Sequence, residues 1–246
     1  MELTFRIKFS LSRKLKGYEL PAISKQHNVT SHIMRTILKD TFETNLGEIE
    51  LSIKSEYAIQ YSVKDNLKIE TENHKIELLV IDLNELKFPE HMKIENSKGW
   101  RIYIEKKSEK SEKLSIICKL INRNPENTWG YNSGENLDAV EIENTKELLH
   151  IGTEDGEVMK WRAENNDWFP IRLKNEISLE KPITNYIDFG FESIIPNLEI
   201  NEKLYLHFLI ATRKKTEMND NENISTWIAV DNSKKELDEL NKKYGL

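Results

Sequence analysis

The sequence has little of several residue types on which small extracellular proteins and membrane proteins depend. It holds one cysteine, Cys118, among 246 residues, which excludes an intramolecular disulfide and a zinc site built from cysteines. It has no run near the ~18 apolar residues that a membrane-spanning helix needs. Its first residues, MELTFRIKF, lack the long apolar block of a signal peptide. These absences predict a soluble, cytoplasmic protein that does not contact a membrane.

Motifs that mark common enzymes are also absent. The sequence contains no GxGxxG, GxxxxGK[ST], GxSxG or HExxH pattern, and its six histidines show no metal-ligand spacing. Otherwise it has the composition of a folded protein, with 38% hydrophobic residues, 32% charged residues and a formal net charge of −6. We therefore expect a packed core, no catalytic residue, no cofactor and no bound metal, and an enzymatic role is the less favoured one.

Alternating apolar and polar residues predict β-strands in much of the first half. In residues 3–9, apolar and polar side chains alternate with a period of two, which is typical of a strand with one buried face. Residues 20–43 change to near-helical spacing, with Thr30 as the N-cap of a helix that continues to about Glu43. The polar stretch 89–98 then interrupts the pattern, so residues 1–95 are predicted to form a small α+β module. Its further strands are expected at 48–53, 57–63, 67–71 and 75–81.

The second half, residues 99–246, is predicted to be an antiparallel β-sandwich with a C-terminal helix. Residues 203–212 are apolar on both faces, which is typical of a central strand. The charged run 105–113 is expected at the solvated tip of a hairpin, and Ser233 with Glu236 forms a capping box that starts the helix. The fold class is thus mainly β. Further strands are expected at 100–104, 114–120, 139–142, 147–152, 158–163, 168–173, 186–195 and 226–230.

Residues 20–42 resemble a helix-turn-helix motif. Residues 1–40 carry eight basic against three acidic side chains, a balance that could form a basic face for phosphates. Pro21, however, falls inside the expected first helix and would shorten it. One amphipathic helix covering a sheet explains the same pattern and is favoured over nucleic-acid binding. Under the nucleic-acid interpretation, the contacting side chains are Lys14, Lys25, Ser31, His32 and Arg35.

Aromatic residues supply the leading candidate site. Trp129, Tyr131 and Asn132 lie in the polar segment 122–136, where stacking on a polar ligand and anchoring of the sandwich are equally compatible with the pattern. Trp161 and Trp168 are expected on one face of a hairpin. They either belong to the core, where tryptophan is more often found, or form a flat platform for a sugar ring.

Other polar residues have simpler interpretations. The acidic segment 152–157, together with Glu164 and Asp167, does not fit an EF-hand and is expected to be a turn between strands. Cys118 alternates with apolar neighbours, so it is expected to be buried and inert. His207 is expected to be a hydrogen-bonded residue in the middle of a strand.

The end of the second half resembles carbohydrate-binding β-sandwich modules, namely the family 9-like and DOMON-like modules and similar segments appended to family 57 glycoside hydrolases. The resemblance rests on the step Glu192 to Pro196, the turn Leu198 to Lys203 and the strand Leu204 to Ala211. It implies a sandwich fold and favours a non-catalytic binding protein that recognises a glycan or a protein partner. A nucleic-acid-associated regulator is the alternative, and a hydrolase of unrecognised type is the third hypothesis.

Overall fold

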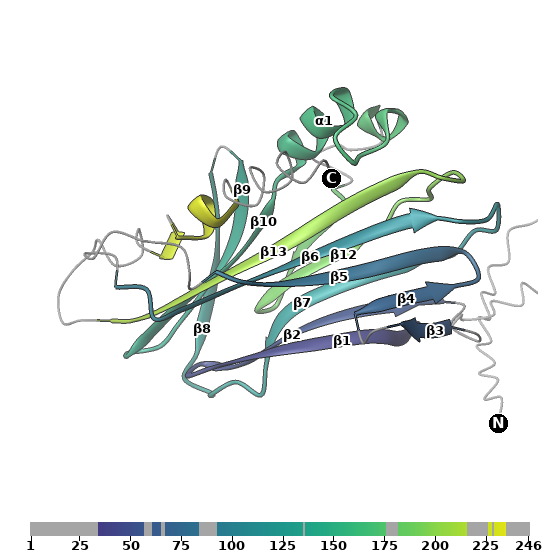
Figure 1. Ribbon diagram of the computed structural model, residues 1–246. Coiled ribbons are helices and arrows are strands. Elements are labelled where there is room, and N and C mark those ends of the chain that lie inside the picture. Colours follow the sequence, from purple (N-terminus) through teal and green to yellow (C-terminus); the bar gives the residue numbers. More distant parts are fainter. Residues whose placement is uncertain are drawn as a thin grey trace, which may run out of the picture. The chain divides into compact units, whose positions relative to one another are not determined.

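The computed structural model describes residues 34–56, 61–64, 67–83, 93–134, 136–175, 182–215, 226–227 and 229–234. The chain divides into two units, Met1–His32 and Ile33–Leu246, and every described residue belongs to the second. Most described residues lie in strands, and the strands form two antiparallel sheets (Figure 1). The prediction of a mainly β fold is therefore confirmed.

The smaller sheet has five strands and the larger has eight. The smaller runs in the order β1 (Arg35–Thr44), β2 (Gly47–Ser55), β7 (Leu114–Ile121), β12 (Gly190–Ile194) and β11 (Thr184–Ile187). The larger runs in the order β3 (Tyr61–Lys64), β4 (Lys68–Thr71), β5 (His74–Asp82), β6 (Asn96–Lys106), β13 (Lys203–Lys214), β10 (Glu147–Glu154), β9 (Leu137–Glu143) and β8 (Thr128–Ser133).

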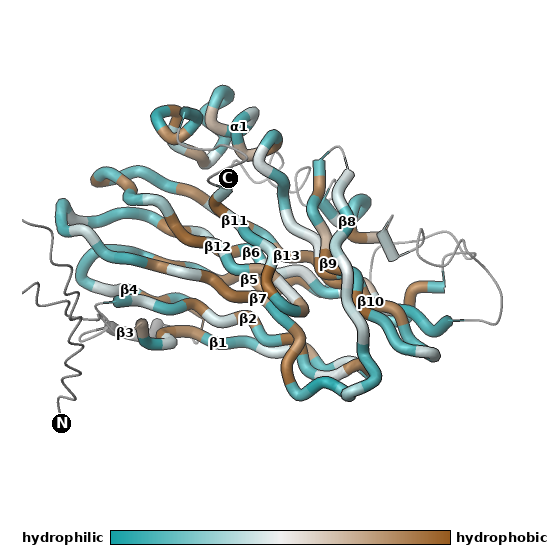
Figure 2. Tube along the Cα trace, turned by 180° about the vertical axis from the view of Figure 1, so that it is seen from behind, coloured by the Kyte–Doolittle hydropathy of each residue, from teal (hydrophilic) through white to brown (hydrophobic). Residues whose placement is uncertain are grey.

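The two sheets share one hydrophobic core. Apolar residues alternate with polar ones along several strands (Figure 2), so each sheet turns an apolar face toward the other. Trp100 and Phe208 of the larger sheet and Leu51 and Cys118 of the smaller belong to the same buried cluster. The larger sheet also buries Leu209 and Ala211 of β13 in a second, smaller cluster. The prediction that Cys118 is buried is confirmed, and burial raises the pKa of its thiol. Face-to-face packing of these positions forms the sandwich.

The described strands do not separate near residues 95–99, where the sequence pattern places a domain boundary. β2 pairs with β7 along its length, and β5 pairs with β6 from His74↔Lys106 to Asp82↔Lys98. Asp40 of β1 also accepts hydrogen bonds from Trp100 Nε1 (2.6 Å) and Lys98 Nζ (2.9 Å) of β6. Each sheet therefore combines strands from both expected modules into one folded unit.

The helix expected to continue to Glu43 is wrong from residue 35 onward, because residues 35–44 form β1. The pairing of β1 with β2 shifts register between Thr36 and Leu38. As a result, the consecutive residues Ile37 and Leu38 are both buried. A bulge of this kind breaks the strict alternation of a strand, and the result looks like helical spacing in the sequence. The expected strand at residues 3–9 lies outside the described residues.

The charged segment 105–113 does not form the expected hairpin tip. It leaves β6 in the larger sheet and enters β7 in the smaller, so it crosses between the sheets. Glu112 within it is buried and accepts hydrogen bonds from Thr71 Oγ1 (3.2 Å), His74 Nδ1 (2.7 Å) and Ser55 Oγ. Burial raises the pKa of Glu112, but the bonds from His74 and Ser55 outweigh this effect and lower it overall. The sequence signal failed here because two charged residues of this run, Lys106 and Glu112, are buried.

Helices replace three of the expected strands. Residues 156–164 form α1 (Gly156–Glu164) and residues 171–175 form the 3₁₀ helix η2 (Ile171–Asn175), so the strands expected at 158–163 and 168–173 are wrong. Residues 226–227 and 229–234 are helical rather than extended. Ser233 therefore lies inside that helix, where its hydroxyl donates to Ala229 O (2.7 Å), and does not cap it.

Candidate functional site

The site begins at an edge that the larger sheet leaves open. On one side of β13, strand β10 pairs with residues 209–214 only. No described strand pairs with residues 203–208 on that side, so this part of the β13 edge is open. Exposed strand edges must be covered, because their backbone groups need partners. Thr153 Oγ1 donates to the carbonyl of His207 (2.8 Å), and Arg162 Nη1 donates to the carbonyl of Tyr205 (3.2 Å). Side chains thus take the place of a neighbouring strand here.

Arg162 reaches this edge because α1 follows β10 directly. Asp155 caps the helix by accepting from Val158 N (2.8 Å), which explains the acidic turn in the sequence. Arg162 is buried and pairs with the buried carboxylate of Glu154. Burial lowers the pKa of Arg162, but the attraction of Glu154 outweighs it and the pKa is raised overall. The guanidinium therefore keeps its charge, and its bond to Glu154 fixes the helix on the strand edge.

The same guanidinium shapes the turn that follows α1. Arg162 Nε donates to Asp167 O and Nη2 donates to Trp168 O, each at 3.2 Å. Asn166 and Trp168 have positive φ angles of 53° and 47°, a conformation that is uncommon outside glycine. Because these hydrogen bonds hold the Asp167 and Trp168 carbonyls, the turn keeps this conformation and presents the Trp168 ring in a fixed position.

An open groove of about 560 Å³ lies beside this turn. Its volume is within the ~300–1,000 Å³ typical of small-molecule sites. The Trp168 ring contacts Tyr103 edge-on, with ring centroids 5.3 Å apart, and Lys203 Nζ lies 5.4 Å from its centroid. The groove combines apolar surface with amides and charges. It is lined by Asn166, Trp168, Phe169, Pro170, Ile171, Arg172, Glu199, Asn201, Glu202 and Lys203.

A buttressed ion pair forms the polar wall of the groove. Arg172 Nε donates to Glu202 Oε1 (2.7 Å), Nη2 donates to Glu202 Oε2, and Nη2 also donates to Asn197 O (2.6 Å). Burial raises the pKa of Glu202, but the hydrogen bonds from Arg172 outweigh it, so the pKa is lowered overall. The wall thus offers charged groups of both signs at fixed positions, which suits a neutral polar ligand better than a polyanion.

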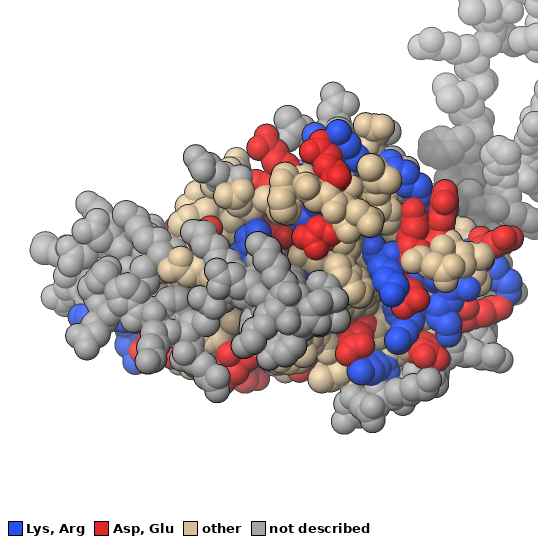
Figure 3. All heavy atoms as spheres, turned by 45° about the horizontal axis from the view of Figure 1, so that its top comes forward, with Lys and Arg blue, Asp and Glu red and all other residues tan. Residues whose placement is uncertain are grey.

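The surface around α1 has the same mixed character. Figure 3 shows acidic and basic side chains side by side on the part of this face that the described atoms cover. Among the described residues, no group of three His, Cys, Asp or Glu side chains is arranged to hold a metal ion. No described helix is long and apolar enough to cross a membrane.

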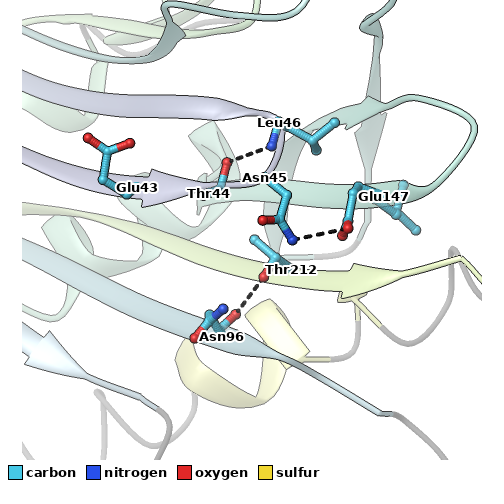
Figure 4. A pocket seen from close by; sticks show the side chains of 8 residues that line it. Glu43, Thr44, Asn45, Leu46, Asn96, Glu147 and Thr212 are labelled. Carbon is cyan, nitrogen blue, oxygen red and sulfur yellow. Dashed lines mark hydrogen bonds between the residues drawn. The ribbon is translucent and has the colours of Figure 1, made fainter.

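A second, smaller pocket of about 190 Å³ lies where the β1–β2 turn meets the larger sheet (Figure 4). Asn45 Nδ2 donates to Glu147 Oε1 (3.0 Å), and Thr212 Oγ1 donates to Asn96 O (3.4 Å). Burial raises the pKa of Glu147. The pocket is below the usual size of ligand sites and its polar groups bond to one another, so it acts as a joint between the sheets.

The structure divides the five predicted aromatic-site residues between two places. Trp168 lines the groove, whereas Trp161 lies on α1 with 57% of its surface exposed and is absent from the lining. The hairpin expected to carry both is wrong, because these residues form α1 and the turn after it. Only Trp168 therefore has the position of a ligand contact.

Trp129, Tyr131 and Asn132 lie on the edge strand β8 rather than in a polar loop. Trp129 packs on the core, with its ring centroid 5.8 Å from that of Phe189. Tyr131 is 75% exposed, and its ring centroid lies 5.4 Å from that of Tyr186. Tyr186 Oη donates to Asn132 O (3.2 Å). These contacts join β8 to the smaller sheet, and none of the three residues lines the groove.

Of the alternative nucleic-acid contacts, Lys14, Lys25, Ser31 and His32 lie outside the described residues. Arg35 is the first residue of β1, so it does not lie on a recognition helix.

Sequence reasoning missed the polar wall of the groove. Arg172 was expected inside a strand, and Asn201 with Glu202 was expected to be only a turn. The single available signal was the polar turn Leu198 to Lys203 in front of a long apolar strand. Comparison with known proteins adds nothing to this assignment: no family model, no curated protein and no solved structure matches the chain.

Proposed function

We propose that the protein is a non-catalytic binding protein that holds a carbohydrate in the groove beside Trp168. The observation that carries the proposal is the composition of this groove, where an indole ring lies among the amides of Asn166 and Asn201 and the Arg172–Glu202 pair. A sugar ring has an apolar face of C–H groups and a rim of hydroxyls. The aromatic and apolar lining suits the face, and the amide and charged groups suit the rim.

Two further features support this assignment. The groove is held in place by the hydrogen bonds from the buried Arg162 side chain to the Asp167 and Trp168 carbonyls, so a ligand would meet a preformed surface. The segment that resembles carbohydrate-binding modules includes Asn201, Glu202 and Lys203, which line the groove. A protein partner on the same surface is the second hypothesis, because Ile171 and Trp161 are exposed apolar residues near it.

Glycan-array screening followed by calorimetric titration of the best glycan tests the proposal. Trp168→Ala should weaken binding at least tenfold, since one aromatic contact often dominates a small site. Asn201→Gly removes one amide while suiting the positive φ of 67° at this position, and it should weaken binding without unfolding the protein.

Trp161→Ala is the matched control, because it removes an exposed tryptophan outside the lining and should leave affinity unchanged. Near-ultraviolet circular dichroism confirms that each variant is folded. If the array shows no glycan binding, or if Trp168→Ala and Asn201→Gly bind as well as the parent protein, the carbohydrate proposal is wrong.

A further inference from the structure

A buried arginine on the outer face of the larger sheet forms no ion pair within the described part of the chain. Arg101 alternates with the core residues Trp100 and Ile102, so it lies on the face opposite the shared core, and only 3% of its surface is exposed. It pairs across β6 with Leu79 of β5 and with His207 of β13. An arginine stays protonated even when buried, so this face holds a permanent positive charge.

The partners of Arg101 among the described residues are two aromatic rings. Its guanidinium carbon lies 4.0 Å from the ring centroid of Tyr205 and 5.2 Å from that of Tyr103. No described carboxylate lies within the 4.0 Å of an ion pair, and its buried Nε has no hydrogen-bond acceptor. Glu154, the buried carboxylate two strands away, is already bound to Arg162. Cation–π contacts of about 0.5–2 kcal/mol each leave the buried Nε–H group without an acceptor among the described residues.

A second buried donor lies next to this guanidinium. The hydroxyl of Tyr103 also has no hydrogen-bond partner among the described residues. Burial raises the pKa of Tyr103, so the phenol keeps its proton at neutral pH. Two neighbouring residues on the same face of β6 therefore offer N–H and O–H donors. Leu79 of β5, which pairs with Arg101, is 43% exposed, and Glu77 pairs with Tyr103.

We propose that Arg101 and Tyr103 form a binding site for a small oxyanion, a carboxylate or phosphate group. A planar guanidinium binds either group through two parallel N–H bonds, and the phenol supplies a third donor. This site goes beyond the carbohydrate groove, whose lining includes neither residue. The oxyanion provides the acceptors that Arg101 Nε and the Tyr103 hydroxyl do not find among the described residues.

Thermal unfolding with added anions tests the site in the full chain. The probes are sodium phosphate and sodium acetate at low millimolar concentration, with sodium chloride at matched ionic strength as reference. Phosphate or acetate should raise the melting temperature by several degrees with saturation, because a ligand that binds only the folded state stabilises it. General salting-out by phosphate rises without saturation, so the two effects are distinguishable. The anion with the lower half-saturation identifies the preferred group.

Substitutions assign the effect to the site. Arg101→Gln should abolish the saturable rise, and Tyr103→Phe, which removes only the hydroxyl, should weaken the apparent affinity about tenfold. Arg123→Gln is the matched control, because Arg123 is an exposed arginine stacked 3.7 Å from the Phe189 centroid, and it should leave the rise unchanged.

If Arg101→Gln does not fold, the change in apparent anion affinity of Tyr103→Phe tests the site by itself, since this substitution preserves the volume of the side chain. The absence of any saturable rise in the parent protein would overturn the proposal. A rise that Arg101→Gln and Tyr103→Phe leave intact would overturn it equally.

Discussion

Glu112 should hold the crossover between the two sheets, and removing its carboxylate should be among the costliest single changes in the charged segment. Its side chain accepts from Ser55, Thr71 and His74, which lie on β2, β4 and β5 of both sheets. Glu112→Ala removes the carboxylate to which all three side chains donate, and truncating one partner of such a buried network costs about 3–5 kcal/mol. Glu112→Gln keeps the shape and should cost about 1.5–3 kcal/mol, the value of hydrogen bonds to a charged group.

Urea unfolding measures both variants, with Glu109→Ala as the control in the same segment. Glu109 is exposed, so its replacement should change the free energy of unfolding by less than about 0.5 kcal/mol. The pKa of Glu112 is lowered in the folded state, so its stabilisation is present above the unfolded value of about 4.3 and is lost as the pH falls through the folded pKa. The stability difference between the parent protein and Glu112→Gln should therefore shrink as the pH falls through the lowered pKa of Glu112. Equal stabilities of Glu112→Ala and Glu109→Ala at pH 7 would refute this reasoning.

Three further predictions concern the core, the β8 edge and the Arg162 clamp. Cys118 should resist thiol reagents in the native protein and react on unfolding, and Cys118→Ala should cost about 1–2 kcal/mol; rapid labelling of the native protein would contradict its burial. Trp129→Ala should lower the free energy of unfolding by about 2 kcal/mol, because the ring is half-buried against the core. The exposed Tyr131 should be worth less than about 0.5 kcal/mol when it is changed to Ala, and equal losses in urea unfolding would show that Trp129 does not anchor β8. Arg162→Met should cost about 3–5 kcal/mol, and the double variant with Glu154→Gln should regain part of this loss; a double variant as unstable as the sum of the single ones would disprove the buried pair.

Most strands could be predicted from the sequence, because their alternation is strict. The predicted segments 48–53, 75–81, 114–120 and 203–212 all lie inside observed strands, since each places its apolar residues on one or both faces of a sheet. The pairing of these strands could not be predicted. Which strand lies beside which depends on contacts that are distant in sequence, such as β6 with β13, and periodicity carries no information about them.

The failures have local physical causes. The segment KWRAENNDWFPIR has the alternation of a hairpin, but Asp155 caps a helix in front of it and Arg162 finds a buried carboxylate in Glu154, so tertiary contacts determine α1. Of the candidate site, the sequence identified Trp168 alone. The polar wall made by Arg172 and Glu202 depends on an ion pair between residues 30 positions apart, which no spacing rule reveals.

The most direct test of the binding function is a crystal structure of the protein with the tightest glycan from the array. We expect electron density for a sugar ring in the groove, in contact with the Trp168 indole and within hydrogen-bond distance of Asn201 or the Arg172–Glu202 pair. Density for the sugar at the β8 edge beside Tyr131, with an empty groove, would contradict the proposed binding site.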